Sequence, residues 1–201
     1  MADITKIKKQ LKKTLDHKRY EHTLGVTYIA AALAMRYAIP GEKSGSGRTL
    51  AENAFLAGLL HDCAKCMDNE KKLAYCKKHK ISVSHFEESN PFLLHAKVGQ
   101  HLAREEFHVK DEDILHAICY HTTGRPGMSL LEKIIFIADY IEPGRTQAPN
   151  LEEIRSTAFQ SLDRTMVMIL SDTLEYLKQH ENKIDPQTGL TYAYYKELEG
   201  I

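Results

Sequence analysis

Apolar residues recur along this chain at the three- and four-residue spacing of amphipathic helices, and strict strand alternation is absent. The spacing predicts helices over residues 4–15, 19–37, 49–62, 70–80, 91–102, 111–121, 129–141 and 150–180. Residues 42–48 are predicted to form a flexible loop, and the tail after Asp185 a loop with a short Tyr-rich segment. The pattern therefore indicates an all-α protein.

Several helix starts carry capping signals. Thr49 and Ser129 each precede a Glu by three residues, which is the capping-box spacing. Asp111 and Asn150 are further predicted N-caps, the latter with Glu153, and Pro91 is predicted to occupy the first turn of its helix. The helix that follows Ser129 is apolar on nearly all sides over residues 134–141, so we expect it to be central.

Length and composition favour one domain. The 201 residues, 43% of them apolar, suffice for one buried core. We predict an N-terminal helix (1–18) packed on a main helical-bundle domain (19–180), followed by a C-terminal tail (181–201). Basic and acidic residues balance at 27 each, which argues against nucleic acid or an anionic membrane as a partner.

The expected environment is the cytoplasm. We find neither an apolar stretch of membrane-spanning length nor a signal-peptide centre in the sequence. The four cysteines (Cys63, Cys66, Cys76 and Cys119) lack a secreted disulfide pattern and are predicted to be reduced thiols. Cys63 and Cys66 have C-x-x-C spacing, but no second ligand pair at zinc-site spacing and no βαβ redox pattern accompany them.

Six metal-binding side chains lie at inward positions of the predicted helices. A single inward histidine is more often a core residue bonded to a carbonyl, but six such accidents together are improbable. Asp139 is the only charge in its apolar run and would be costly to bury unpaired. The predicted ligands are His22, His61, Asp62, His95, His121 and Asp139.

The mixture of imidazoles and carboxylates indicates two transition-metal ions. Iron, manganese or zinc suit such a set better than magnesium or calcium, which prefer oxygen ligands. A carboxylate can bridge two ions whereas an imidazole binds one, so we expect Asp62 to bridge. Such a pair of ions suits phosphoester or phosphoanhydride hydrolysis. His101 rivals His95 as a ligand, and the remaining histidines (His17, His79, His85, His108, His116 and His180) are assigned to solvent.

These residues, in this order, resemble the HD-domain superfamily of metal-dependent phosphohydrolases. The segments 19–26, 58–65, 120–124 and 138–145 are similar to the YqeK family in particular. The resemblance implies an all-α HD-domain bundle with a di-iron-type centre that hydrolyses diadenosine tetraphosphate symmetrically to two ADP. The loop 42–48, which looks individual to this chain, would then border the site.

Nearby polar residues acquire candidate roles from this resemblance. Arg19, Lys65 and Arg145 are predicted to contact phosphates, and Arg125 and Lys97 are weaker candidates. Thr122 and Thr123 could donate hydroxyls to a phosphoryl oxygen. Lys65, or an ordered water, is the candidate that protonates the leaving ADP oxygen.

Other functions remain open at this point. One is an HD phosphohydrolase that acts on a nucleoside mono- or triphosphate or on a cyclic dinucleotide. A second is a nucleotide-binding sensor with slow chemistry, and a third is a redox oxygenase on the same scaffold. The expected ligands are a dinucleoside polyphosphate or a nucleotide such as ADP or GDP, and a homodimer is compatible with the sequence.

Overall fold

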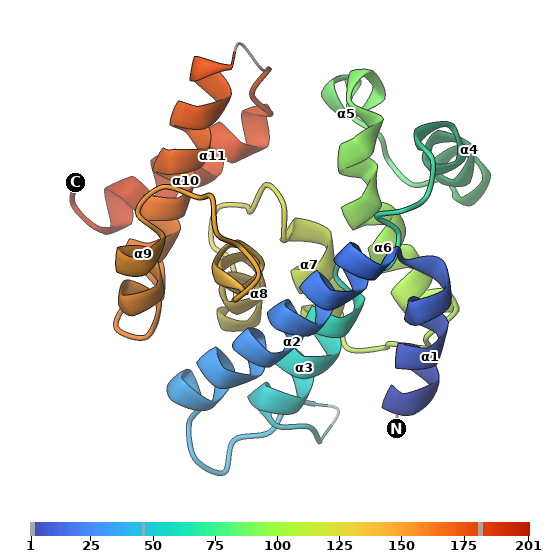
Figure 1. Ribbon diagram of the computed structural model, residues 1–201, viewed down its shortest axis with the longest axis horizontal. Coiled ribbons are helices and arrows are strands. Elements are labelled where there is room, and N and C mark those ends of the chain that lie inside the picture. The colour runs from blue at the N-terminus through green and yellow to red at the C-terminus, as the bar shows by residue number, and fades with distance from the viewer. Residues whose placement is uncertain (1–2, 46, 181–182) are drawn as a thin grey trace.

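The computed structural model describes residues 3–45, 47–180 and 183–201, and within these ranges every regular element is helical (Figure 1). The all-α prediction is therefore confirmed. The elements are α1 (Ile4–Thr14), α2 (His17–Tyr37), α3 (Leu50–Leu60), α4 (Asn69–His79), α5 (His85–Ser89), the 3-10 helix η1 (Pro91–Leu94), α6 (His95–Glu105), α7 (Glu112–Tyr120), α8 (Leu130–Ile141), α9 (Leu151–Ala158), α10 (Leu162–Gln179) and α11 (Pro186–Leu198).

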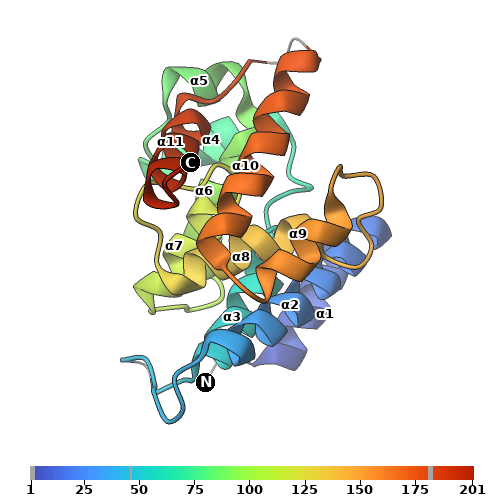
Figure 2. The ribbon, with the colours of Figure 1, turned by 90° about the vertical axis from the view of Figure 1, so that its left-hand side faces the viewer.

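Helix α8 is the central element, as its apolar pattern predicts. It packs against α2, α3, α7, α9 and α10, and Ile134, Ile135 and Ile137 are fully buried. Figures 1 and 2 show α8 in the interior in both views. Because α8 carries Asp139, the core of the bundle places this carboxylate among the other candidate ligands.

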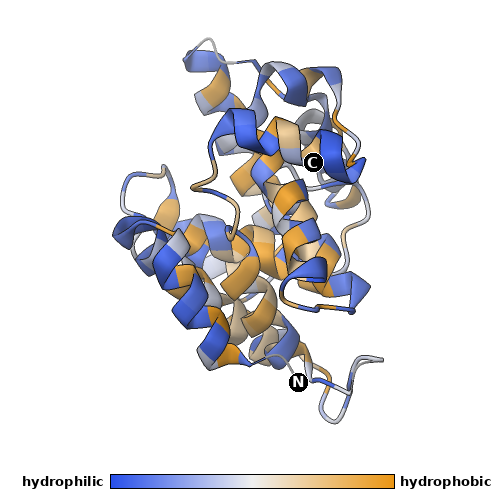
Figure 3. Ribbon diagram, turned by 90° about the vertical axis from the view of Figure 1, so that its right-hand side faces the viewer, coloured by the Kyte–Doolittle hydropathy of each residue, from blue (hydrophilic) through white to orange (hydrophobic). Residues whose placement is uncertain are grey.

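Helices α2 and α3 form the most extensive helix pair, and a glycine permits their close approach. A Cβ on Gly58 would lie 2.9 Å from Cα of Thr27, closer than packed atoms allow. A second, smaller apolar cluster lies beneath α4 and includes Cys76, Leu94 and Val98. Figure 3 shows hydrophobic turns facing the inside of the bundle and hydrophilic turns facing outward.

The predicted capping boxes at Thr49 and Ser129 are both present. In each, the hydroxyl accepts a hydrogen bond from the backbone N–H three residues on, and the Glu carboxylate accepts one from the N-cap N–H. Asp111 caps α7 by accepting from the N–H of Asp113. The irregular backbone predicted for 42–48 is also found, residue 46 lying outside the described ranges.

The single helix predicted over 150–180 is wrong, because the chain breaks at residues 159–161. Asn150 adopts a left-handed φ of 51° and makes no side-chain cap. Its amide instead donates to the carboxylate of Asp172, 22 residues away. Ser161 accepts a hydrogen bond from the N–H of Arg164 and so starts α10 as a separate helix.

The prediction that the chain after Asp185 forms a loop with a short Tyr-rich segment is also wrong, because this part is a helix. Asp185 caps α11 and Pro186 fills its first turn, and this helix packs against α10. Upstream, residues 85–89 form a short helix that the apolar spacing did not predict, and Pro91 starts a 3-10 turn ahead of α6. The boundaries proposed for domain and tail, at residues 18 and 181, stay a prediction.

Within the described ranges, no helix combines the length and the apolar character needed to cross a bilayer. The four cysteines are unpaired thiols. Burial raises the pKa of the Cys63 thiol to about 12, so this sulfur is protonated at neutral pH. The Cys66 thiol is exposed and donates to Asp16. A redox pair at Cys63 and Cys66 gains no support from this arrangement.

Candidate metal centre

Five helices deliver the six predicted ligands to one place. The residues come from the second turn of α2, the start of α6, the C-terminal ends of α3 and α7, and the last turn of α8: His22, His95, His61 with Asp62, His121, and Asp139. Five of them form two overlapping groups in which all ligand atoms lie within 4.8 Å of one another: His22, His61 and Asp139, and His61, Asp62 and His121. The sixth, His95, belongs to neither group, but its Nε2 lies 3.1 Å from Nε2 of His121.

Asp62 lies between the histidines with one oxygen toward each pair. Its Oδ1 lies 3.2 Å from Nε2 of His95 and 3.5 Å from Nε2 of His121. Its Oδ2 lies 3.6 Å from Nε2 of His61 and 3.9 Å from Nε2 of His22. This is the arrangement that a carboxylate needs in order to bridge two cations.

Backbone carbonyls fix the orientation of three of these imidazoles. In each, Nδ1 lies 2.7 Å from the carbonyl oxygen three residues earlier in the chain, namely His61 with Gly58, His95 with Phe92, and His121 with Ile118. A carbonyl only accepts, so each Nδ1 must be the donor. Nε2 is therefore the unprotonated nitrogen in the neutral ring, and its lone pair faces the centre.

His22 is held by a carboxylate instead. Its Nδ1 lies 3.2 Å from Oε1 of Glu142, which is buried, and its Nε2 lies 3.0 Å from Oδ1 of Asp139. The N–H of Gly144 donates to Glu142 at 2.6 Å and orients that carboxylate. Carboxylates that hold a ligating histidine in this way are a recurrent feature of metal sites.

Sequence reasoning did not assign roles to Glu142 or Arg155. Arg155 donates to the carbonyls of Ile141 at 3.1 Å, Glu142 at 2.9 Å and Arg145 at 2.9 Å, and so holds the turn after α8. A carboxylate directly after an apolar run, three residues beyond Asp139, was the available signal for Glu142. Arg155 offered none, because its contacts are made only by the folded chain.

Burial and charge together perturb the pKa values of the centre. Burial lowers the pKa of both His61 and His95 to about 4. Burial alone would raise the pKa of Asp62, but the imidazoles of His61, His121 and His95 close to it hold it well below the usual value. The pKa of Asp139 is likewise lowered, against the effect of its burial, by its contact with His22.

Three buried polar atoms of the centre have no hydrogen-bond partner among the described residues: Nε2 of His22, Nε2 of His61 and Oδ1 of Asp62. Orphaned buried acceptors are costly unless a cation or donor satisfies them. Lone pairs converging from imidazoles and carboxylates fit transition-metal cations. The residues present thus fit the predicted pair of metal ions. The support comes from the chemistry of these nitrogen and oxygen ligands as well as from the fold.

Three predicted phosphate-binding cations border the centre and remain partly open to solvent. Nη1 of Arg19 lies 2.8 Å from Oδ2 of Asp62, and Nζ of Lys65 lies 3.1 Å from Nε2 of His95. Nη2 of Arg145 donates to the carbonyl of Asp139 at 3.0 Å. Their side chains are 32%, 33% and 38% exposed, so each can still contact an anion from the solvent side.

The other predicted contacts differ in their placement. The Thr122 hydroxyl lies 3.3 Å from Nε2 of His95 and 3.2 Å from Nε2 of His121, at the centre itself. The Thr123 hydroxyl donates to the carbonyl of Gly124. Arg125 forms a bidentate pair with Glu132, and Lys97 pairs with Glu87 at 2.7 Å. The structure thus brings Thr122 to the ligands and engages Thr123, Arg125 and Lys97 in other contacts.

The rival His101 lies elsewhere, with its Nδ1 2.9 Å from the hydroxyl of Tyr75. His79, which was assigned to solvent, stacks on the same Tyr75 and is partly buried. His116 is partly buried as well, beside Tyr120. The other four histidines assigned to solvent are exposed: His17, His85, His108 and His180.

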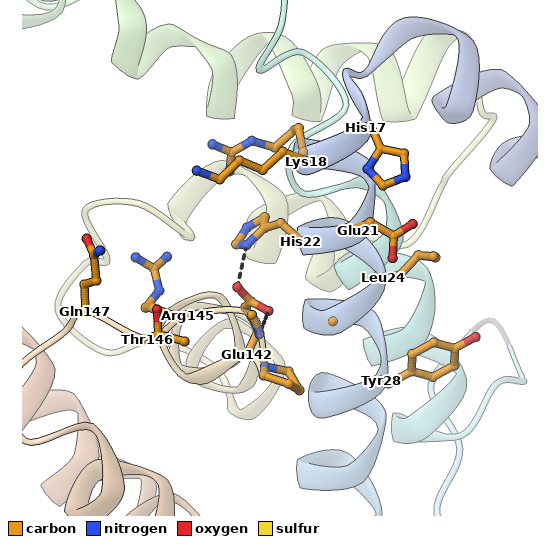
Figure 4. Close-up of a pocket in the computed structure, with 14 residues that line it drawn as sticks. His17, Lys18, Glu21, His22, Leu24, Tyr28, Glu142, Arg145, Thr146 and Gln147 are labelled. Atoms are coloured by element: carbon orange, nitrogen blue, oxygen red, sulfur yellow. Dashed lines mark hydrogen bonds and ion pairs between the residues drawn. The ribbon is translucent and has the colours of Figure 1, made fainter.

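A cavity of about 950 Å³, here called the His22 cavity, opens beside the centre between α2 and the turn after α8. Lys18, Arg19 and Arg145 line it together with His22. In Figure 4, Lys18, His22 and Arg145 lie on the Glu142 side of α2, whereas the side chains of Glu21 and Tyr28 lie on the opposite side. The part next to the ligands is therefore rich in cations.

Comparisons with known proteins agree with this geometry. The HD domain family matches residues 19–144, which include all six candidate ligands. The chain is 39% identical to the symmetrical bis(5'-nucleosyl)-tetraphosphatase of Bacillus subtilis (strain 168), over 92% of each chain. It is 36% identical to the protein of the same name from Staphylococcus aureus (strain NCTC 8325 / PS 47), over 96% of this chain and 94% of that one.

A solved structure is similar over nearly the whole chain. It is a predicted HD superfamily hydrolase from Clostridium acetobutylicum, described as involved in NAD metabolism. The TM-score is 0.89 at 37% identity, and the match covers 98% of this chain and 99% of that one. The architecture around the centre is thus shared with an experimentally determined fold.

Proposed function

Because the chain belongs to the HD-domain family and, within it, to the YqeK family, we propose that it hydrolyses diadenosine tetraphosphate symmetrically to two ADP. The observation that carries the proposal is Asp62, with one oxygen toward each pair of histidines. Relatives named for this activity match over nine-tenths of the chain. A phosphoanhydride is a substrate that a pair of cations beside Arg19, Lys65 and Arg145 suits well.

We propose that two transition-metal ions, most reasonably iron and with manganese or zinc as alternatives, are held by the six ligands His22, His61, Asp62, His95, His121 and Asp139. When bound, such ions polarise phosphoryl oxygens and lower the pKa of water. Glu142 and the three backbone carbonyls keep the imidazole lone pairs directed inward. Asp62 and Asp139 supply the negative charge that offsets the cations.

The charged side chains bind and orient the tetraphosphate. Arg19 and Arg145 border the centre with partly exposed guanidinium groups, which can contact phosphoryl oxygens in bidentate fashion. The Thr122 hydroxyl can donate to an oxygen of the phosphoryl group under attack. Water adds to one inner phosphorus and releases a proton to the solvent, and the bond from that phosphorus to the oxygen shared with the other inner phosphorus breaks. Lys65 gives a proton to that oxygen, which leaves as part of the second ADP, and regains a proton from the solvent.

We further propose a cytoplasmic location, where nucleotides are formed and used. We expect ADP to bind as the product, and GDP to bind as the corresponding product of a guanine dinucleotide. The competing enzyme hypotheses concern other substrates, so they predict no turnover of diadenosine tetraphosphate. Attack at an outer phosphorus of the tetraphosphate chain would instead release AMP and ATP in place of two ADP. Product analysis therefore separates the proposed reaction from other phosphohydrolase activities on the same fold.

The proposed function is tested by metal analysis and turnover of anaerobically purified protein. We expect near two metal ions per wild-type chain, and Asp62→Ala and His61→Ala should lose metal and lower kcat roughly 100-fold or more. His180→Ala changes an exposed histidine away from the centre and should behave as wild type. Release of AMP plus ATP, or full activity in the Asp62 or His61 variant, would contradict the proposal.

A further inference from the structure

A second cavity lies beside the metal centre, on the side of α7. It has a volume of about 540 Å³ and is lined by residues of α5, η1, α6, the end of α7 and the start of α11. Thr122 forms part of its wall, so it is called the Thr122 cavity.

Each cavity borders a residue that lies beside Asp62 or beside another candidate ligand. His22 lines the first cavity, and its Nε2 lies 3.9 Å from Oδ2 of Asp62. Thr122 lines the second and contacts Nε2 of His95, which lies 3.2 Å from Oδ1. A ligand that occupies both cavities would therefore meet His22 on one side and Thr122, beside His95 and His121, on the other.

The cavities differ in charge. The His22 cavity presents Lys18, Arg19 and Arg145. In the Thr122 cavity, the Lys97 ammonium is neutralised by Glu87 at 2.7 Å, and Asp185 adds a carboxylate. A polyphosphate is thus favoured in the first cavity and disfavoured in the depth of the second, which suits an uncharged group instead.

The remaining lining of the Thr122 cavity suits a nucleoside. Phe86 and Tyr120 offer aromatic rings on which a base can stack, and Leu190 adds apolar surface. Arg125 lies over the Tyr120 ring, 5.0 Å from its centroid. Gln187 contributes an amide with both donor and acceptor. The volume of about 540 Å³ lies within the range of small-molecule sites.

We propose that the Thr122 cavity binds one nucleoside of a dinucleoside polyphosphate and the His22 cavity binds the other, so that the phosphate chain between them passes the centre with two phosphates on each side. This inference rests on the proposed function. It accounts for a symmetrical cut, because the two inner phosphates then lie at the centre and each ADP product keeps its own nucleoside pocket. It also predicts that one chain binds two ADP, one in each cavity.

The test fills the Thr122 cavity from α11. Leu190 and Leu198 lie on this helix with similar exposures of 58% and 56%, but only Leu190 lines the cavity. We expect Leu190→Trp to lower kcat/KM for diadenosine tetraphosphate about tenfold, mainly through KM. Equilibrium dialysis of metal-loaded protein should give two ADP per wild-type chain and one per Leu190→Trp chain, whereas Leu198→Trp should match wild type in both measurements.

Either of two results would overturn the inference: a single ADP per wild-type chain, or two ADP and an unchanged KM in Leu190→Trp. Gln187→Ala provides a second variant, because it removes an amide from the lining of the cavity without adding bulk. Like Leu190→Trp, it should raise KM for diadenosine tetraphosphate. Failure of the proposed function is separately visible, since wild-type protein would then release no ADP from diadenosine tetraphosphate.

Discussion

At the residue scale, the centre depends on which nitrogen of each histidine carries the proton. Three imidazoles donate Nδ1–H to carbonyls at 2.7 Å, and His22 faces the Glu142 carboxylate. Each bond within the helix ends spans only three residues and is a local consequence of backbone geometry. The Glu142 bond spans 120 residues and depends on the packing of α2 against the turn after α8.

Glu142→Ala should weaken metal binding, because His22 loses the partner that fixes its ring. Removal of such a partner typically costs about 10–100-fold in metal affinity or activity. Chelator competition on the loaded protein would measure the affinity. Glu21→Ala is the matched control, since this exposed glutamate lines the same cavity but lies on the opposite side of α2 (Figure 4). Equal affinities in the two variants would contradict the role of Glu142.

The metal-free protein should lose stability as the pH falls from about 6.5 to about 4. The pKa of His61 and of His95 lies near 4 in the folded chain and near its ordinary value of 6.5 after unfolding. The unfolded chain therefore binds more protons in this window, and acid favours unfolding. The raised pKa of His22 opposes this, but only as one group against two.

Urea unfolding in the presence of chelator at pH 7 and pH 5 would measure this effect. The free energy of unfolding should be smaller at pH 5. Below the ordinary pKa of the carboxyls, protonation of Asp62 and Asp139 adds to the loss, because their pKa values are lowered in the folded chain. A free energy of unfolding that is equal at the two pH values would refute the assignment of neutral, buried imidazoles.

At the scale of elements, the centre requires α2 and α3 to lie close together. Gly58 makes this contact, and its carbonyl also holds His61. The same residue thus serves helix packing and ligand orientation. Gly25 plays a similar part on the other face of α2, where a Cβ would lie 2.7 Å from Oε2 of Glu142.

Gly58→Ala should destabilise the fold by about 1–3 kcal/mol, because the added Cβ meets the backbone of Thr27 and neither helix can yield locally. Thermal unfolding would measure the change. Gly189→Ala is the contrasting variant: it lies in α11 with no atom within 4 Å of the added Cβ. There, helix propensity should raise stability by about 0.5–1 kcal/mol. Equal effects at the two glycines would contradict the close approach of α2 and α3.

At the scale of the whole molecule, α11 connects the end of the chain to the segment that follows His121. The Tyr195 hydroxyl accepts a hydrogen bond from the N–H of Met128 at 3.0 Å, and Thr191 donates to the carbonyl of Thr123 at 3.0 Å. Tyr195 is buried, so the hydrogen bond is shielded from water. The C-terminal helix therefore helps to fix the turn that carries Thr122.

Tyr195→Phe should cost about 1–3 kcal/mol of stability, because it leaves the Met128 N–H buried without an acceptor. Tyr194→Phe is the natural comparison, since Tyr194 is 40% exposed and its neighbour carries the bond. Both variants remove one tyrosine hydroxyl, so the difference between their midpoints of urea unfolding reports the contribution of the buried hydrogen bond of Tyr195. Two variants of equal stability would show that α11 does not anchor this turn.

The sequence alone determined the local structure and the candidate ligands. Helical periodicity and capping boxes predicted α2, α3, α7 and α8, and the inward stripes singled out the six ligand candidates that the structure brings together. It did not predict the break before α10 or the helix α11, because the cap residues Ser161 and Asp185 were not recognised as helix starts. The predicted cap at Asn150 fails because that side chain binds Asp172 instead.

Only the tertiary structure decided how these pieces meet. The support of His22 by Glu142, the turn held by Arg155 and the two cavities beside His22 and Thr122 all join residues far apart along the chain. Local periodicity shows which face of a helix is buried but not which partner it meets. The candidate ligands were therefore readable from the sequence, whereas the groups that orient them and the cavities beside them required the packing of the helices.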